Sequence, residues 1–417
     1  MKGELAAIVG RLTLLLAMAG ASLGQSDAFQ VLHSFGGPGD GIGPSSGMIF
    51  DKQGNAYGET LGGGNTSCTG GCGLVYELSP QKNGSWVETI LYEFAGGSEG
   101  EEPNGGLAMD ATGKLYGVTE FGGASASGTM FKLAPSSSGW IVTILHSFCT
   151  PPDCADGYAP RFGPVLDPAG NLYATAGQHQ GVAYELTPGP SGWTETVLYT
   201  FCSQPNCTDG DFPSGVVRDS AGNLYGTARE GGAFGYGALF TLRSTPEGAW
   251  KYVLLHSFRG GSDGVYPDTV VPNGKALYGL TDQGGGSRLC TLGCGTIFEL
   301  TASPAGGPPV ETVLHRFAPA AEGQFPQGSL AFDGAGNLYG ATGYGGAICG
   351  CGVVFEMTPG AGGTWQYQII HDFDDQDGVL PQYGVIYHGG HLFGTTLGGG
   401  QYGVGVIYEI SGASATN

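Results

Sequence analysis

The stretch DGDFPSGVVRDSAGNLYGTAREGGAFGYGALFTL, residues 209–242, contains most of one repeating unit of the chain. It begins with an acidic residue, Gly, two variable residues and Pro, and continues through apolar runs at 215–219, 223–227 and 238–242. A fourth run follows at 251–258. Short runs of aliphatic and aromatic residues, joined by turns rich in Gly and Asp, predict four consecutive β-strands.

The acidic-Gly-x-x-Pro motif occurs seven times. Its acidic residues are Asp40, Glu99, Asp156, Asp209, Asp263, Glu322 and Asp377. A Phe that closes the fourth strand recurs with the same period, at Phe35, Phe94, Phe148, Phe201, Phe258, Phe317 and Phe373. Four short strands per unit of about 55 residues are typical of a propeller blade. We therefore predict one all-β domain over residues 25–417, a seven-bladed β-propeller with four-stranded blades.

The two ends of the chain predict how the ring closes. The first strand, 29–35, matches a fourth strand, and the last, 405–410, matches a third strand. The N-terminal strand is therefore expected to pair into the last blade, which would hide two sheet edges. A stacked β-solenoid is the alternative, but it favours shorter, stricter repeats with terminal caps, and the sequence shows neither.

Composition supports a folded, exported protein. The chain has 82 Gly among 417 residues, 41% hydrophobic and only 12% charged residues. The net charge of -21 would repel a phosphate backbone, so nucleic acid is excluded as a partner. Residues 1–24 combine Lys2 and Arg11 with a short Leu- and Ala-rich core, which predicts a signal peptide and not a membrane span. A secreted protein, extracellular or at the cell surface, is expected.

The cysteines agree with export, because they form closely spaced pairs. The pairs are Cys68 and Cys72, Cys149 and Cys154, Cys202 and Cys207, Cys290 and Cys294, and Cys349 and Cys351. In an exported chain this spacing predicts local disulfides, of which the last would close a small, strained ring. Zinc binding is the alternative, but a structural zinc needs four ligands together and these pairs fall in different repeats. No residue is assigned to a metal.

The repeat resembles a known family. The motifs are an acidic residue with G-x-x-P, then D-x-x-G-N-L-Y-G, then C-G-T-[IV]-F-E-L, as in residues 223–227 and 293–298. Together they resemble the GloVer tandem repeat of exported bacterial proteins, over essentially all of the predicted mature chain. The resemblance implies export and, for many members, the cell surface. It implies no activity and no catalytic residues.

One face of the predicted propeller carries the long loops. The acidic motifs lie in the crossing loops from one blade to the next, and the Gly-Gly stretches lie in the second-to-third loops of the same face. Loops held by a rigid scaffold favour binding. The seven acidic residues could surround the channel mouth and bind a cation such as calcium, or recognise a basic or hydroxyl-rich ligand. Alternatively, each carboxylate hydrogen-bonds the backbone of its own turn, which its recurrence in every blade favours.

The residue after each motif Pro is polar and differs from blade to blade. These residues are Ser45, Asn104, Arg161, Ser214, Asp268, Gln327 and Gln382. Varied polar side chains at a channel entrance can give specificity, although a solvated strand entrance would look the same. The third blade departs most from the repeat, with Tyr173-Ala174 in place of Tyr-Gly and a short loop at 177–181. That sector is the main candidate for a site.

Two other recurring sets have structural interpretations. A His or Tyr precedes each closing Phe by two residues, at His33, Tyr92, His146, Tyr199, His256, His315 and His371. A propeller separates these outer strands, so packed or hydrogen-bonded side chains are expected and not a shared metal site. Trp86, Trp140, Trp193, Trp250 and Trp365 open fourth strands and are expected to anchor hairpins, although aromatic rings also stack on sugars.

No nucleophile elbow, zinc helix or phosphate loop is present in the sequence. The leading hypothesis is a monomeric, exported scaffold that binds an extracellular glycan or surface protein. A lyase or hydrolase acting at the channel mouth is the second hypothesis, because propellers also host such enzymes. Arg161, Asp268 and the neighbouring acids would then be the residues to test. A structural surface or matrix protein is the third.

Overall fold

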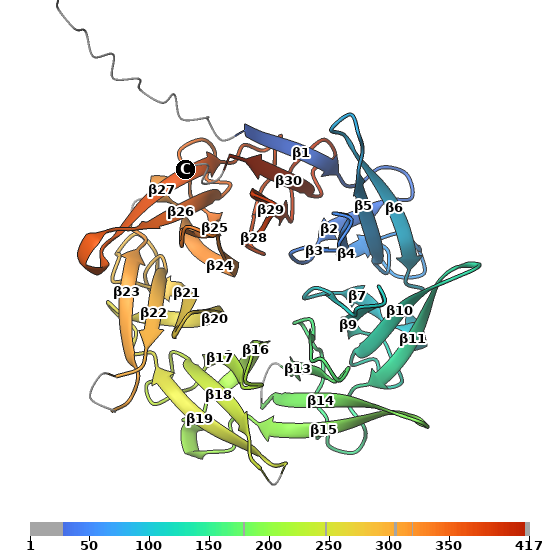
Figure 1. Ribbon diagram of the computed structural model, residues 1–417, viewed down its shortest axis with the longest axis horizontal. Coiled ribbons are helices and arrows are strands. Elements are labelled where there is room, and N and C mark those ends of the chain that lie inside the picture. Colours follow the sequence, from blue (N-terminus) through green and yellow to red (C-terminus); the bar gives the residue numbers. More distant parts are fainter. Residues whose placement is uncertain (1–27, 178–179, 247, 304–306, 319, 413–417) are drawn as a thin grey trace, which may run out of the picture.

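Each sequence repeat folds into one antiparallel sheet in this computed structural model, and the described residues form seven sheets arranged in a ring (Figure 1). The structure describes residues 28–177, 180–246, 248–303, 307–318 and 320–412. The predicted signal peptide lies outside these residues. The seven-bladed β-propeller predicted from the repeats is confirmed. No helix in the described part of the chain has the length and apolar character needed to cross a membrane.

In the first two blades the innermost strand is divided in two. Blade 1 contains β2 (Gly41–Pro44), β3 (Ile49–Phe50), β4 (Ala56–Gly63), β5 (Leu74–Pro80) and β6 (Trp86–Glu93). Blade 2 contains β7 (Glu101–Pro103), β8 (Ala108–Met109), β9 (Leu115–Phe121), β10 (Thr129–Ser136) and β11 (Gly139–Ser147). Blade 3 contains β12 (Val165–Leu166), β13 (Leu172–Ala176), β14 (Val182–Gly189) and β15 (Gly192–Thr200).

The remaining blades have one continuous strand at each position. Blade 4 contains β16 (Asp211–Arg218), β17 (Leu224–Glu230), β18 (Ala238–Ser244) and β19 (Trp250–Ser257). Blade 5 contains β20 (Gly264–Asn273), β21 (Ala276–Gly284), β22 (Thr296–Thr301) and β23 (Val310–Arg316). Blade 6 contains β24 (Gln324–Phe332), β25 (Leu338–Tyr344), β26 (Val353–Pro359) and β27 (Trp365–Asp372). Short 3-10 turns lie at η1 (Gly97–Glu99), η2 (Pro205–Cys207), η3 (Ala320–Glu322) and η4 (Ala361–Gly363).

Blade 7 closes the ring as predicted. It combines β28 (Val385–His388), β29 (His391–Thr396) and β30 (Val406–Ser411) with the N-terminal strand β1 (Ala28–Ser34). β1 and β30 pair antiparallel, from Ala28 opposite Ser411 to Ser34 opposite Val406. The two ends of the described chain therefore complete one sheet (Figure 1). This pairing covers backbone groups that would otherwise be open to another chain.

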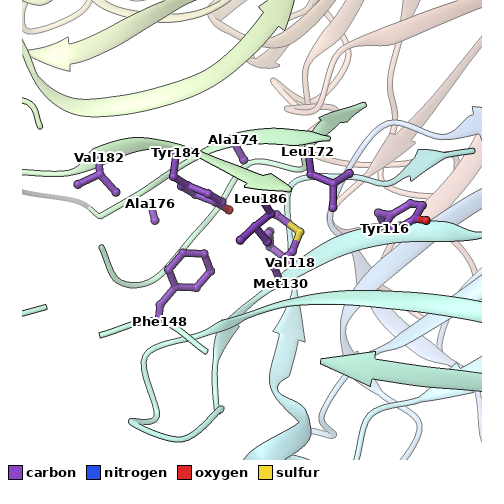
Figure 2. Close-up of a cluster of buried hydrophobic side chains, with 10 residues drawn as sticks. All are labelled: Tyr116, Val118, Met130, Phe148, Leu172, Ala174, Ala176, Val182, Tyr184 and Leu186. Atoms are coloured by element: carbon purple, nitrogen blue, oxygen red, sulfur yellow. The ribbon is translucent and has the colours of Figure 1, made fainter. Parts of the chain in front are cut away.

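The core consists of apolar layers between neighbouring blades. Figure 2 shows the layer between blades 2 and 3, where Met130 and Phe148 of one blade meet Leu172, Tyr184 and Leu186 of the next. All five side chains are essentially inaccessible to solvent. Each such burial stabilises the fold by about 1.5–3 kcal/mol. The middle strands are buried on both faces, which is why they form continuous apolar runs and not alternating ones.

The Pro of each acidic motif forms a joint with the previous blade. In blade 6, Pro326 lies against Gly295 of blade 5, where a Cβ atom would stand 2.3 Å from the Pro Cδ atom. Gly295 also has a φ of +107°, a conformation that disfavours any side chain. The same Gly–Pro contact recurs at the other blade boundaries, at Gly73–Pro103, Gly128–Pro160, Gly181–Pro213, Gly237–Pro267, Gly352–Pro381 and Gly405–Pro44. The motif is therefore explained by close packing between blades.

At six of the seven joints, the amide of the residue before the motif Pro donates a hydrogen bond to the previous blade. The Phe325 amide donates to the carbonyl of Cys294 at 2.9 Å, and the Leu380 amide donates to Cys351 at 2.9 Å. These pre-proline residues all have a left-handed backbone, namely Gly43, Glu102, Ala159, Phe212, Tyr266, Phe325 and Leu380. Residues before Pro normally adopt an extended conformation, so the non-glycine members store backbone strain of order 1–3 kcal/mol each.

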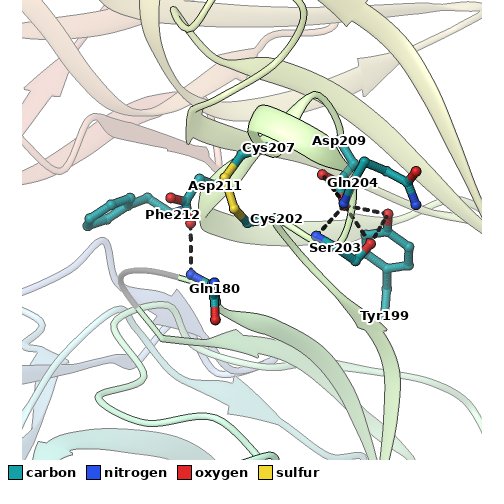
Figure 3. The surroundings of a disulfide bond; sticks show 9 residues. All are labelled: Gln180, Tyr199, Cys202, Ser203, Gln204, Cys207, Asp209, Asp211 and Phe212. Atoms are coloured by element: carbon teal, nitrogen blue, oxygen red, sulfur yellow. Dashed lines mark hydrogen bonds between the residues drawn. A yellow bond between two sulfur atoms is a disulfide. The ribbon is translucent and has the colours of Figure 1, made fainter.

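The five predicted disulfides are confirmed. Three fix second-to-third loops, namely Cys68–Cys72, Cys290–Cys294 and Cys349–Cys351. Cys149–Cys154 and Cys202–Cys207 fix crossing loops. Figure 3 shows the second crossing loop, in which Asp209 accepts hydrogen bonds from Ser203 and Tyr199 beside the disulfide. The disulfides thus hold the loops of the face on which the sequence predicted a site.

Candidate binding site at the ring centre

The polar residues after the motif prolines gather at the centre of the ring. Five of them line one cavity of about 330 Å³, namely Asn104, Arg161, Asp268, Gln327 and Gln382. Ser214 lines an adjoining cavity of about 380 Å³, which also contains Arg161 and Asp268. Ser45 is buried instead, and its hydroxyl donates to the carbonyl of Pro103 at 2.9 Å. The innermost strands bring these positions together because each blade contributes the same register position to the centre.

Arg161 is held against a buried carboxylate. Its Nε atom donates to Oε1 of Glu120 at 2.8 Å, and Asn104 donates to the other oxygen, Oε2, at 3.2 Å. The Glu120 side chain is 6% exposed, whereas that of Arg161 is 47% exposed. Glu120 lies at the end of the second strand of blade 2, and Arg161 follows the motif Pro of blade 3. The pair therefore orients a solvent-facing guanidinium across a blade boundary.

A second pair of the same kind lies across the ring centre. Arg229 donates from Nη2 to Oδ2 of Asp282 at 2.5 Å, and Gln327 donates to Oδ1 of the same residue at 2.8 Å. The Asp282 side chain is 7% exposed and that of Arg229 is 39% exposed. The guanidinium of Arg229 also lies 5.1 Å from the centre of the Tyr266 ring. Such a cation–π contact further restricts its orientation.

Asp268 adds a partly buried carboxyl group to both cavities. Its Oδ2 atom accepts a hydrogen bond from the amide of Gly328 at 2.6 Å. Burial raises the pKa of Asp268 above its ordinary value, although the Gly328 amide and the nearby charge of Arg229 oppose this. The carboxyl is therefore held ready to donate or accept a hydrogen bond within the cavity.

Blade 1 contributes a second unusual acid. Glu59 on β4 is 1% exposed, and its Oε2 atom accepts a hydrogen bond from the Gly106 amide at 3.1 Å. Its Oε1 atom has no hydrogen-bond partner among the described residues. Burial raises the pKa of Glu59 to about 8, so this side chain is mostly protonated at neutral pH. Glu59 therefore adds little negative charge next to the ring centre.

Among the aromatic side chains near the ring centre, those of blades 3 and 4 line the cavities. Phe162 lines both cavities, and Phe212 lines the one that contains Ser214. Phe212, Tyr266 and Phe325 are the pre-proline residues of three consecutive blades, and all have a left-handed backbone. Tyr344 packs edge-on against Phe325 with ring centres 5.8 Å apart, and it is 51% exposed. Strained backbone that presents aromatic rings beside a cavity is typical of a binding site.

The seven acids of the repeated motif are not among the residues that line these two cavities. They bind their own crossing loops and the outermost strands. Asp40, for example, accepts hydrogen bonds from the amides of Gly36 and Gly41 and lies 3.1 Å from Nε2 of His33. Glu99 accepts a hydrogen bond from Tyr92 at 2.8 Å. Each acid thus connects the crossing loop to the His or Tyr that precedes the closing Phe.

The remaining acids make equivalent contacts. Their partners are His146 for Asp156, Tyr199 for Asp209, His256 for Asp263, His315 for Glu322 and His371 for Asp377. Burial acts to raise the pKa of Asp40 and of Asp263, but the histidines and loop amides outweigh it and lower both values. These acids therefore have clear structural partners, and cation binding at the ring centre stays an untested prediction for them.

Sequence reasoning missed three charged residues of the site. Glu120, Arg229 and Asp282 occupy the same repeat position, two residues after the Tyr-Gly-x of the second strand. The other blades have Leu61, Gly177, Gly343 and Leu397 there. The signal was available, because a charge at a position that is otherwise Gly or Leu breaks the repeat. The prediction did not use it since it considered only the residues next to the prolines.

Similarity to solved structures is confined to the fold. Puromycin hydrolase is 15% identical over 85% of this chain and 50% of its own, with a TM-score of 0.52. An ancestral GH74 enzyme is 14% identical over 90% of this chain and 51% of its own, with a TM-score of 0.52. A fungal alcohol oxidase of the AA5 family, in complex with copper, is 12% identical over 93% and 76%, again with a TM-score of 0.52. This chain spans about half the length of the first two.

No curated protein sequence matches the chain. The Gloeobacter/Verrucomicrobia repeat family matches it over residues 22–181 and 165–408. These regions contain all seven copies of the acidic motif and nearly all of the ring. The resemblance noted in the sequence is thereby confirmed, and the chain belongs to the Gloeobacter/Verrucomicrobia repeat family.

Proposed function

We propose that this protein is a secreted binding scaffold whose ligand is an extracellular glycan, held at the ring centre over blades 3 to 5. The observation that carries the proposal is the pair of guanidiniums, Arg161 and Arg229, each oriented by a buried carboxylate at the edge of the same cavity. These pairs, with three amide side chains in the same cavity, supply planar donors and acceptors. Sugar hydroxyls need both.

Charge favours a hydroxyl-rich ligand over a strongly anionic one. Glu120 and Asp282 compensate the two guanidiniums, and the chain carries a net charge of -21. A highly charged polyanion would be repelled at long range. The rings of Phe162, Phe212 and Tyr266 supply apolar surface on which the carbon face of a sugar can stack. Pockets that bind small molecules combine such apolar walls with a few convergent polar groups.

Secretion is part of the proposal. It is supported by the predicted signal peptide over residues 1–24, by five disulfides and by membership of a bacterial repeat family. Disulfides persist in oxidising compartments, and here they fix loops on the face that carries the cavities. The alternative partner, a surface protein, would need a larger contact area than the cavities provide.

A glycan array probed with the oxidised protein tests the proposal, once with calcium and once with EDTA. The Arg161→Ala and Arg229→Ala variants should each lose at least tenfold in affinity for the glycan that the wild type selects. Arg243→Ala is the matched control, because Arg243 is exposed at the end of β18 and lies in neither cavity. Binding that Arg243→Ala and the two site variants retain equally would reject the ring centre as the site.

A second candidate function rests on Asp268. A carboxyl group that lines a cavity and has a raised pKa is suited to act as a general acid, so a hydrolase or lyase would use Asp268 as its proton donor. Incubation of the selected glycan with the wild type and with Asp268→Asn distinguishes the two functions. Cleavage by the wild type alone would identify an enzyme, and binding without cleavage by both would identify a scaffold.

A further inference from the structure

The outermost strands carry a second set of polar clusters, away from the ring centre. One position of each fourth strand pairs with the last apolar residue of the third strand, as Glu88 does with Leu78. The residues at this position are Phe29, Glu88, Val142, Glu195, Tyr252, Glu311 and Tyr367. Where this residue is Glu, it lies beside the His and the motif acid of the previous blade boundary. Where it is aromatic, it stacks on that His or Tyr.

The first cluster joins blades 7 and 1. Nε2 of His33 on β1 lies 3.1 Å from Oδ2 of Asp40 in the crossing loop and 3.6 Å from Oε2 of Glu88 on β6. One ligand atom from each of the three residues lies within 4.8 Å of the other two. The three side chains are 22%, 10% and 13% exposed, so the cluster is sheltered but open to water and ions. Glu88 Oε1 is buried without a hydrogen-bond partner among the described residues.

The second cluster repeats this arrangement between blades 4 and 5. Nε2 of His256 lies 3.5 Å from Oδ2 of Asp263, and Glu311 on β23 brings a carboxylate within the same 4.8 Å limit. Within the described structure, neither His256 Nε2 nor Glu311 Oε1 makes a hydrogen bond. The two clusters therefore contain the same three kinds of metal ligand at the same positions of their blades. In both, at least one buried nitrogen or oxygen atom has no hydrogen-bond partner among the described residues.

The separations fit a metal ion. Zinc bonds to imidazole nitrogen and carboxylate oxygen are about 2.0–2.2 Å long, so tetrahedral ligand atoms lie about 3.3 Å apart. The distances from the His nitrogen to the carboxylate oxygens are 3.1 and 3.6 Å in the first cluster, and the distance to Asp263 is 3.5 Å in the second. They bracket that value. One imidazole and two carboxylates suit Zn²⁺ and neighbouring transition metals, with water as the fourth ligand. We propose that the His33–Asp40–Glu88 and His256–Asp263–Glu311 clusters each bind one divalent transition metal ion at a blade boundary.

Neighbouring charges rank the two sites. Burial raises the pKa of Glu311 to about 7 even though the positive charge of the nearby Arg316 acts to lower it. At the first cluster, the buried hydroxyl of Tyr76 lies near Glu88 and Asp40, and its raised pKa keeps it neutral. A fixed positive charge opposes cation binding. The first site is therefore expected to bind the metal more tightly than the second.

The other boundaries provide natural controls. At the boundary of blades 2 and 3, Glu195 is present, but His146, Asp156 and Glu195 do not bring one ligand atom each within 4.8 Å of one another. At the boundary of blades 6 and 7, Phe29 takes the place of the Glu and stacks on His371 with ring centres 3.7 Å apart. His371 and Asp377 are thus paired without a third ligand. These boundaries are not expected to bind a metal.

Titration with Co²⁺ tests the proposal, because its visible absorption distinguishes tetrahedral protein ligation from the hydrated ion. Full-length, oxidised wild type should bind two equivalents at pH 7.5. Glu88→Gln and Glu311→Gln should each bind one, and the double variant none, whereas His371→Gln should still bind two. Affinity should fall as the pH falls, because the His must be neutral and the carboxyl groups ionised to bind the metal. Circular dichroism of each variant establishes that it is folded.

Two results would overturn the proposal. One is the absence of tetrahedral Co²⁺ absorption in the wild type, which would mean that the clusters only hold a hydrogen-bonded His between carboxylates. The other is a stoichiometry that does not change in the folded double variant, which would place the metal elsewhere. Both measurements are made without a glycan. Their outcome therefore tests the metal sites without testing the proposed function at the ring centre.

Discussion

The blade boundaries and the ring centre are built from the same seven repeats, but the boundary residues recur from blade to blade whereas the central residues vary. At the boundaries, the same Gly–Pro contact recurs around the ring, with Gly295 and Pro326 as one instance. At the centre, the equivalent positions differ from blade to blade, so that Arg229 and Asp282 stand where other blades have Gly or Leu. Repetition therefore identifies what holds the ring together, and departure from repetition identifies the candidate site.

The strongest test of the boundary contact is a Cβ at Gly295. Gly295→Ala should lower the free energy of unfolding by about 3 kcal/mol or more, because the new atom meets Pro326 and the Thr281 carbonyl in a left-handed conformation. Gly139→Ala is the control, since Gly139 has a similar φ of +114° but open space around its Cβ position. Urea denaturation compares the two. Equal losses would show that backbone conformation alone, and not the contact, requires Gly295.

Removal of a carboxylate at the ring centre should lower the free energy of unfolding by less than Gly295→Ala does. Glu120→Ala leaves Arg161 and Asn104 without their shared acceptor, so we expect a loss of about 1–3 kcal/mol in stability. Arg161 is half exposed and can be rehydrated, which limits the loss. Denaturant unfolding of Glu120→Ala is compared with Glu230→Ala, a partly exposed acid on β17. A larger loss in the control would contradict a role for Glu120 in orienting Arg161.

The boundaries that contain a Glu should differ from the others in pH dependence. Burial and the charge of Asp156 raise the pKa of Glu195 to about 7 from its ordinary value of 4.5. Folding therefore takes up a proton between these values, and the free energy of unfolding falls as the pH rises through that window. Glu195→Gln should remove this fall and be more stable than wild type by about 1–2 kcal/mol at pH 8. At pH 4 the two should be nearly equal.

Thermal unfolding across this pH range checks the expectation. A variant that is less stable than the wild type at pH 8 would show instead that the ionised Glu195 makes a favourable contact. Glu230→Gln is again a suitable control.

The smallest effect is expected where strain and packing offset each other. Phe325→Gly relieves a left-handed pre-proline residue but removes the ring that packs against Tyr344. Blade 1 already has Gly43 at this position. Stability should change by less than about 1 kcal/mol. Glycan binding should weaken if the aromatic residues form part of the site. Isothermal titration with the selected glycan measures this, and unchanged affinity would remove Phe325 from the proposed site.

Most of the fold could be predicted from local patterns. The period of the closing Phe residues predicted the number of blades, and the unmatched strands at 29–35 and 405–410 predicted the closure, which the pairing of β1 with β30 confirms. The cysteine spacing also predicted the disulfides, because the two cysteines of each pair lie within a few residues of each other in the sequence. Strand ends differed from the prediction by a few residues. β16, for example, begins at Asp211 because the acidic motif itself enters the sheet.

The blade count and the loop disulfides could be read from the amino-acid sequence because hairpins, tight turns and short cysteine loops are formed by neighbours in the chain. The closure could be predicted because an unmatched fourth strand at one end complements a blade that lacks one at the other end. Which side chains meet at the ring centre became visible in the folded protein alone. The fold paired Arg161 with Glu120 and Arg229 with Asp282 across blade boundaries, and it placed the motif acids beside the outermost strands. These partners lie a blade apart in sequence. Their contact depends on how neighbouring blades are oriented relative to each other. Side-chain packing between the blades sets this orientation, and no local sequence pattern encodes it.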